Sequence, residues 1–273
     1  MDAPTGPTLA GPVGMLWMTR APWGTAMSFC ACVWRRGELL VAADSRITLS
    51  ARGLAHGVSF VCTDNEQKVF CCPRARLVVA YAGAAAIKGR LTADLLGTFS
   101  GQNDVEGMGT GELVTRLCEF VGKQLGCDGK AALMRSFLVV AGLADGKAVV
   151  RTMSGGRVRT MRRSSGLVSC SYVPADVVVA LRVLCGASLE SAMDAFIARR
   201  AREVHCGGPV DLVRVSKGGA MWVRRKAAGP GYRTVKEWLV AASRGEFEWV
   251  GAGGTSGVLP RVGPEHIRTD VER

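Results

Sequence analysis

The 273-residue sequence lacks several features that mark common protein classes. It has no C-x-x-C pair and its three histidines are far apart, which excludes a zinc finger and a thioredoxin-type redox motif. No apolar run approaches the roughly 18 residues of a membrane-spanning helix, and the first residues carry no basic segment typical of a signal peptide. We therefore expect a cytoplasmic protein without a membrane partner, a metal or another cofactor.

What the sequence does have is positive charge, with 35 Lys and Arg against 23 Asp and Glu and a net charge of +12. Residues 146–175 contain no carboxylate and six basic residues, namely Lys147, Arg151, Arg157, Arg159, Arg162 and Arg163. Nucleic-acid binding is one interpretation, but too few aromatic residues lie nearby to form a stacking platform. We expect instead a solvated strand face or a contact with an acidic partner, and no nucleic acid.

The order of expected elements predicts the fold class. Strands are expected at 28–34, 38–43, 67–72 and 77–82. Apolar residues at every fourth position predict one helix from Ile87 to Phe99 and another from Leu113 to Leu125. Further strands, a second helix pair beginning near 174 and 188, and a closing hairpin at 210–225 follow. Runs of strands between helix pairs indicate an α+β fold with antiparallel sheets covered by helices, because parallel sheets alternate single strands and helices.

The first expected hairpin brings two opposite charges to a strand end. If its turn centres on Arg36, Ser28 lies opposite Asp44 at the open end of the ribbon. Asp44 and Arg46 are two residues apart and so share a face of the strand. On these residues alone, a solvated strand end with a salt bridge is the simplest interpretation.

Four motifs that occur in a fixed order along the chain resemble those of one protein family. The segment SFCACVWRRGELLVAADSR, residues 28–46, resembles the start of mature proteasome β-subunits and of the bacterial HslV peptidase. EQKVF at 66–70 resembles the strand with the family's lysine, and VAYAGAAA at 79–86 resembles its small-residue turn. Residues 188–202, followed by HCGGPVDL at 205–212, resemble its fourth helix and closing hairpin. The resemblance covers residues 28–225, with a leader or propeptide at 1–27 and a helix and Gly-rich tail at 226–273.

This resemblance implies an Ntn-hydrolase fold, an αββα four-layer sandwich with two antiparallel sheets between helix layers. It also implies that Ser28 is the nucleophile, in place of the family's usual Thr, and that its own α-amine is the base. An α-amine titrates between about 7.7 and 8.0, close to working pH. Lys68 would lie beside the hydroxyl, held by Asp44, and the backbone N–H of Gly83 would face the oxyanion. The remaining expected site residues are Arg46, Ser165, Glu203 and Cys206.

The implied function is a peptidase that hydrolyses polypeptides inside a ring or stacked homo-oligomer, with an ATP-dependent unfoldase as partner. The basic residues of 147–163 would then belong to subunit contacts or to a chamber wall. Two alternatives remain open on these residues. One is a catalytically inactive structural subunit that keeps its leader, and the other is an Ntn amidase acting on a small molecule.

The residue that becomes the N-terminus also has alternatives. Gly24-Thr25 offers the family's usual Gly-Thr junction, but Thr25 is three residues before Ser28, so strand alternation would point it to the opposite face. Met27 directly precedes Ser28. If translation starts at Met27, removal of the initiator methionine would expose Ser28 without self-cleavage.

Overall fold

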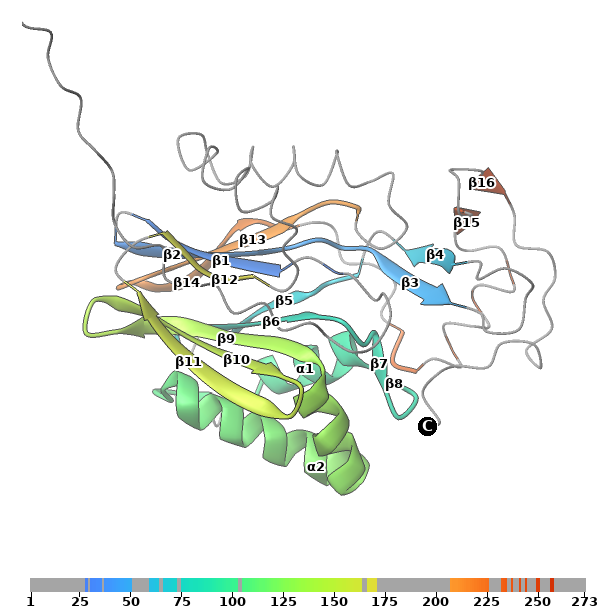
Figure 1. Cartoon of the computed structure of the whole chain (residues 1–273), viewed down its shortest axis with the longest axis horizontal. Helices are drawn as coiled ribbons and strands as arrows, with labels where there is room; N and C mark the ends of the chain where they lie inside the picture. The colour runs from blue at the N-terminus through green and yellow to red at the C-terminus, as the bar shows by residue number, and fades with distance from the viewer. Residues whose placement is uncertain are drawn as a thin grey trace, which may run out of the picture.

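The structure is a computed structural model, shown whole in Figure 1. It describes residues 28, 30–35, 37–50, 59–63, 66–72, 75–102, 105–163, 166–170, 207–225, 232–234, 237, 241, 244, 249–250 and 256–257. Of the described strands, five form one sheet in the order β12-β1-β2-β13-β14. Their bounds are β1 Cys30–Arg35, β2 Glu38–Ala43, β12 Gly166–Cys170, β13 Asp211–Ser216 and β14 Gly219–Arg224.

A second set of five described strands forms a sheet in the order β11-β10-β9-β6-β5. Their bounds are β5 Val69–Cys72, β6 Leu77–Ala82, β9 Phe137–Ala144, β10 Lys147–Ser154 and β11 Arg157–Arg163. The hairpin between β9 and β10 turns at Asp145 and Gly146, both with positive φ (51° and 69°), as Asp-Gly turns between strands commonly are. Every strand pairing in the described part of the chain is antiparallel.

The two described helices cover the second sheet (Figure 1). They are α1 (Thr92–Ser100) and α2 (Thr110–Arg135), which is interrupted at Gly126, where φ is 75°. Three short two-stranded sheets complete the described elements. They pair β3 Ile47–Ser50 with β4 Ser59–Thr63, β7 Ala86–Ile87 with β8 Arg90–Leu91, and β15 Trp249–Val250 with β16 Ser256–Gly257.

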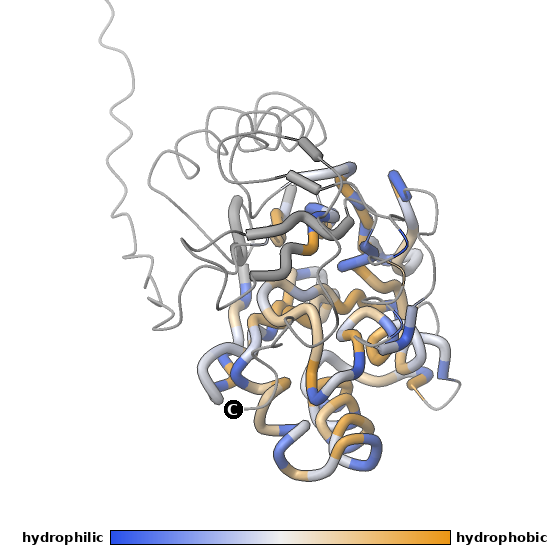
Figure 2. Tube along the Cα trace, turned by 90° about the vertical axis from the view of Figure 1, so that its right-hand side faces the viewer, coloured by the Kyte–Doolittle hydropathy of each residue, from blue (hydrophilic) through white to orange (hydrophobic). Residues whose placement is uncertain are grey.

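Hydrophobic side chains form two layers of core. One layer lies between the two sheets, where Val41 and Val213 of the first sheet meet Val78 and Val139 of the second. The other layer lies between the second sheet and the two helices, and it includes Phe99. Figure 2 shows hydrophobic stretches of the trace, in orange, in the interior of the described part of the chain. The second sheet is therefore apolar on both faces, and it joins the first sheet to the helices.

Several element predictions can be compared with these bounds. The strands expected at 38–43 and 77–82 are found with those limits, as β2 and β6. The helix expected from Ile87 is wrong in its first turn, because Lys88 and Gly89 have positive φ (47° and 77°) and α1 begins only at Thr92. Residues 47–66, between the first two pairs of expected strands, contain two further strands, β3 and β4, that were not among those expected.

The other expected helix pair, near 174 and 188, lies outside the described residues. So does most of the segment 226–273, including the expected tail. The αββα sandwich and the three-part division of the chain therefore stay predictions.

Candidate active site

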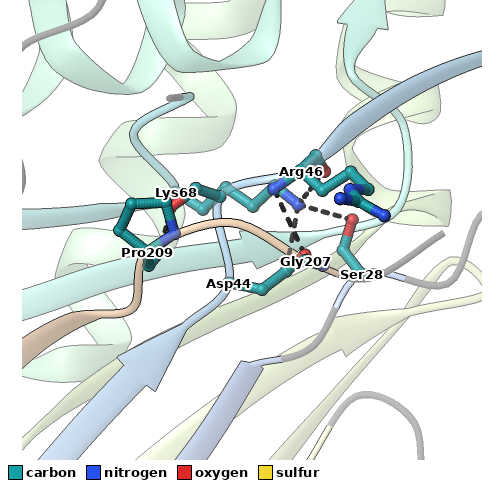
Figure 3. A network of polar contacts seen from close by, with 7 residues as sticks. Ser28, Asp44, Arg46, Lys68, Gly207 and Pro209 are labelled. Carbon is teal, nitrogen blue, oxygen red and sulfur yellow. Dashed lines mark hydrogen bonds and ion pairs between the residues drawn. The ribbon is translucent and has the colours of Figure 1, made fainter. Parts of the chain in front are cut away.

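The side chain of Lys68 is the centre of a buried polar cluster at the ends of several strands (Figure 3). Lys68 directly precedes β5, and only 1% of its surface is exposed. Its Nζ donates hydrogen bonds to Ser28 Oγ at 2.8 Å, to Asp44 Oδ1 at 3.0 Å and to the backbone oxygen of Arg46. An ammonium group has three N–H donors, so these acceptors among the described residues use its full capacity.

Asp44 supplies the negative charge that balances this ammonium. It follows β2 directly and is fully buried. While its Oδ1 accepts from Lys68, its Oδ2 accepts the backbone N–H of Arg46 at 3.3 Å and that of Gly207 at 3.2 Å. A buried carboxylate is tolerated when it is paired and hydrogen-bonded in this way. Asp44 therefore fixes the position of the Lys68 ammonium.

The segment before β13 also belongs to the cluster, although it is distant from Asp44 and Lys68 in the sequence. The backbone oxygen of Gly207 accepts the N–H groups of Ser45 and Arg46, at 3.0 and 3.1 Å. The Ser45 hydroxyl donates to the backbone oxygen of Pro209. A Cβ at Gly207 would lie 2.5 Å from the guanidinium carbon of Arg46, closer than real Cβ atoms approach other groups. A larger residue at this position would therefore force the guanidinium of Arg46, a residue only 8% exposed, to move.

Ser28 lies at the edge of the cluster, half-buried and just before β1. The β1–β2 register pairs Cys30 with Ala43, one residue away from the register that would place Ser28 opposite Asp44. That detail of the prediction is wrong. The two side chains nevertheless meet, because both contact the same Lys68 ammonium.

Gly83 is at the same end of the second sheet as Lys68. The N–H of Tyr81 donates to the backbone oxygen of Lys68 at 3.0 Å, and Gly83 is two residues further along, directly after β6. Its φ of +119° lies in the region that favours glycine. The turn at Gly83 therefore has a backbone conformation that a larger residue would adopt only with strain.

Tyr81 is a site neighbour that the sequence did not single out. The sequence could have identified Tyr81, because it belongs to the expected strand that follows the one containing Lys68, and neighbouring strands of this kind often pair. The phenol is 1% exposed, and its hydroxyl has no hydrogen-bond partner among the described residues. Burial raises the pKa of Tyr81 well above its usual value, and the charges of Glu66 and Asp44 raise it further. Tyr81 therefore stays neutral beside the cluster.

The structure brings together four of the eight expected site residues, Ser28, Asp44, Arg46 and Lys68, and places Gly83 at the same sheet end. The other three, Ser165, Glu203 and Cys206, lie outside the described residues. The contribution of Gly207 as a donor to Asp44 was not predicted. It depends on long-range pairing, although Gly207 belongs to the HCGGPVDL motif.

The cluster presents a cation directly beside a hydroxyl oxygen. An ammonium at 2.8 Å stabilises negative charge that develops on that oxygen, and burial strengthens the effect because little water screens it. Within the described ranges, no group of three or more His, Cys, Asp or Glu side chains is placed to hold a metal ion. The arrangement is suited to activating Ser28 as a nucleophile.

Two further findings bear on the chain as a whole. None of the helices in the described part is both long and apolar enough to cross a membrane. The sequence matches no protein-family model, and a comparison with curated proteins gives no significant match.

Proposed function

We propose that the protein is an N-terminal-nucleophile hydrolase that cleaves peptide bonds, with Ser28 as its nucleophile. The observation that carries the proposal is the buried Lys68 ammonium, 2.8 Å from Ser28 Oγ and 3.0 Å from Asp44 Oδ1. Half-burial of Ser28 leaves part of the residue accessible to a substrate.

The proposed reaction begins once residues 1–27 are removed and Ser28 has a free α-amine. Ser28 Oγ attacks the substrate carbonyl carbon, and the α-amine takes the hydroxyl proton. Lys68 stabilises the negative charge that develops on Oγ, and Asp44 keeps the ammonium in position. The backbone N–H of Gly83 is proposed to donate to the oxyanion. The α-amine then protonates the leaving amine, and water hydrolyses the acyl-Ser28 ester by the reverse proton transfers.

The resemblance of residues 28–225 to proteasome β-subunits and HslV extends this proposal to the fold and the assembly. Two antiparallel sheets and the helices α1 and α2 agree with three layers of an αββα sandwich, and residues 174–202 would supply the fourth. Ser165, Glu203 and Cys206 would support the α-amine. In this proposal the subunits form a closed or stacked homo-oligomer in the cytoplasm, and an ATP-dependent unfoldase delivers polypeptides.

The mature N-terminus and its reactivity test the proposal. Intact mass of protein from its native host is expected to show a chain beginning at Ser28. A peptide epoxyketone or β-lactone is expected to label Ser28, and Ser28→Ala abolishes labelling while Ser28→Thr retains it. A species that keeps residues 1–27 and is fully active would refute the α-amine mechanism.

The same experiment separates the two alternatives. A structural subunit would keep its leader and remain unlabelled, even after the leader is removed by an engineered cleavage site. A small-molecule amidase would be labelled, but it would hydrolyse small amides and leave an unfolded polypeptide such as casein intact.

A further inference from the structure

We infer that the edge strand β11 is a docking surface for an acidic polypeptide segment, which adds to the second sheet as an extended strand. This inference is independent of the chemistry proposed for Ser28. It rests on the position of β11 in its sheet, on the exposure of its side chains and on its charge.

Within the described residues, β11 is hydrogen-bonded on one side only. It pairs with β10 along its whole length, from Ser154 opposite Arg157 to Ala148 opposite Arg163. Figure 1 shows β11 at the margin of the sheet, and no described strand lies beyond it. Alternate residues of an edge strand direct their N–H and C=O groups away from the sheet, where another strand can bind them.

The side chains of β11 are open to solvent. Residues 155–160 are all exposed, and so is Arg162. Val158, 41% exposed, is an exposed hydrophobic residue among them. A strand that bound here would therefore meet accessible side chains on both faces of β11.

Three arginines of β11 have unused side-chain hydrogen-bonding capacity. The backbones of Arg157, Arg159 and Arg162 pair with β10, but their side chains make no hydrogen bond or ion pair with any residue that the structure describes. Arg151 of β10 differs, because its guanidinium donates to Thr110 at 3.2 Å and to Thr160 at 2.8 Å. Each guanidinium carries five N–H donors suited to a carboxylate, so these three of the four arginines of β11 can select an acidic ligand.

The two faces of β11 indicate what such a ligand looks like. Arg157 and Arg159 share one face with Met161, which packs toward the core between the sheets, whereas Val158 and Arg162 are on the other face. Residues directly opposite on neighbouring strands interact most strongly. Carboxylates on the face of the added strand beside Arg157 and Arg159, with an apolar residue beside Val158 on its other face, would complement this part of β11.

Other occupants fit less well. A second copy of the chain that paired β11 with its own β11 would place arginines opposite arginines, and like charges directly opposite destabilise a strand pair. Residues 147–163 contain no aromatic side chain on which nucleic-acid bases could stack. Arginines on an edge strand also discourage aggregation, but a purely protective role predicts no preference for acidic strands.

The test measures binding of fluorescent peptides to the full chain by anisotropy. The main probe is an eight-residue peptide of alternating Glu and Val, and its matched control alternates Glu and Pro, because proline removes the N–H groups that a strand needs. We expect the Glu-Val peptide to bind at least about tenfold more tightly, as in other strand additions where backbone hydrogen bonds supply affinity. It should also slow amide hydrogen exchange across residues 157–163.

The variant Arg157→Glu/Arg159→Glu/Arg162→Glu is expected to weaken Glu-Val binding at least about tenfold, through loss of the exposed charge pairs. Its matched control is Lys123→Glu/Lys130→Glu/Lys217→Glu, which changes the net charge equally at exposed lysines outside β11. Circular dichroism verifies folding, and the corresponding Arg→Gln triple variant replaces the first if it fails to fold.

Three results would overturn the inference. Equal binding of the Glu-Pro peptide would mean that no strand is added. An equal loss in the control variant would mean that only overall charge attracts the peptide. Tighter binding of an oligothymidylate of the same charge would identify β11 as a nucleic-acid surface instead.

Discussion

Removal of the Lys68 side-chain charge should destabilise the protein substantially. In Lys68→Met, Asp44 remains fully buried but loses the ammonium that lies 3.0 Å from its Oδ1. Breaking a buried ion pair by deleting one partner typically costs about 3–5 kcal/mol. Asp44 keeps two backbone donors, from Arg46 and Gly207, so we expect the lower end of that range, about 3 kcal/mol.

A double-mutant cycle measures how much of this cost arises from the pair. In Lys68→Met/Asp44→Asn no unpaired charge remains, and the Asn oxygen still accepts the two backbone N–H groups. We therefore expect the double variant to recover about 1–2 kcal/mol relative to Lys68→Met, within the usual range of coupling energies for contacting residues.

Urea denaturation followed by far-ultraviolet circular dichroism gives the free energies of unfolding. Lys217→Met, at an exposed position, is the matched control and should change stability by less than about 0.5 kcal/mol. The reasoning is refuted if Lys68→Met costs less than about 1 kcal/mol, or if the double variant is as destabilised as the sum of the two single variants.

Four other outcomes follow from packing and ionisation. Gly142→Ala should cost about 1–3 kcal/mol in urea denaturation, because the new Cβ would overlap Leu77 Cδ2 in the core. By contrast, Gly97→Ala in α1 makes ordinary contacts and should stabilise the protein by about 0.5–1 kcal/mol through helix propensity. Burial raises the pKa of Cys71 to about 12, so iodoacetamide at pH 8 should label the exposed Cys127 first, as peptide mass spectrometry would show. Because the folded-state pKa of Cys71 is raised, its contribution to stability is complete below about pH 9 and is lost as the pH rises toward about 12. Thermal unfolding across that range should show a falling midpoint.

Local sequence patterns were sufficient to predict part of the fold. The strands at 38–43 and 77–82 are uninterrupted apolar runs between turn residues, so their limits could be predicted. Ile87 and Leu91 are four residues apart and mimic a helix face, yet they belong to the short strands β7 and β8. The positive φ angles of Lys88 and Gly89 break the helix there, and nothing in the apolar spacing signals them.

The candidate site was predictable to the extent that its residues adjoin expected strands. Asp44 follows one apolar strand and Lys68 precedes another, and the motif resemblance connected both with Ser28. The donor at Gly207 depends on which distant strands become neighbours. That information is in the three-dimensional pairing of β2 with β13, and spacing along the chain does not contain it.

The hydrogen bond from Gly207 to Asp44 joins residues 163 positions apart, so it has a consequence for when the site forms during synthesis. On the ribosome, Ser28, Asp44 and Lys68 emerge long before Gly207. Contacts between such distant residues form late, because the loop that separates them must first close. A nascent chain therefore contains Ser28, the proposed nucleophile, but lacks the backbone groups that hold its neighbours in place. In this way the order of synthesis itself delays assembly of the site until strand β13 has joined β2.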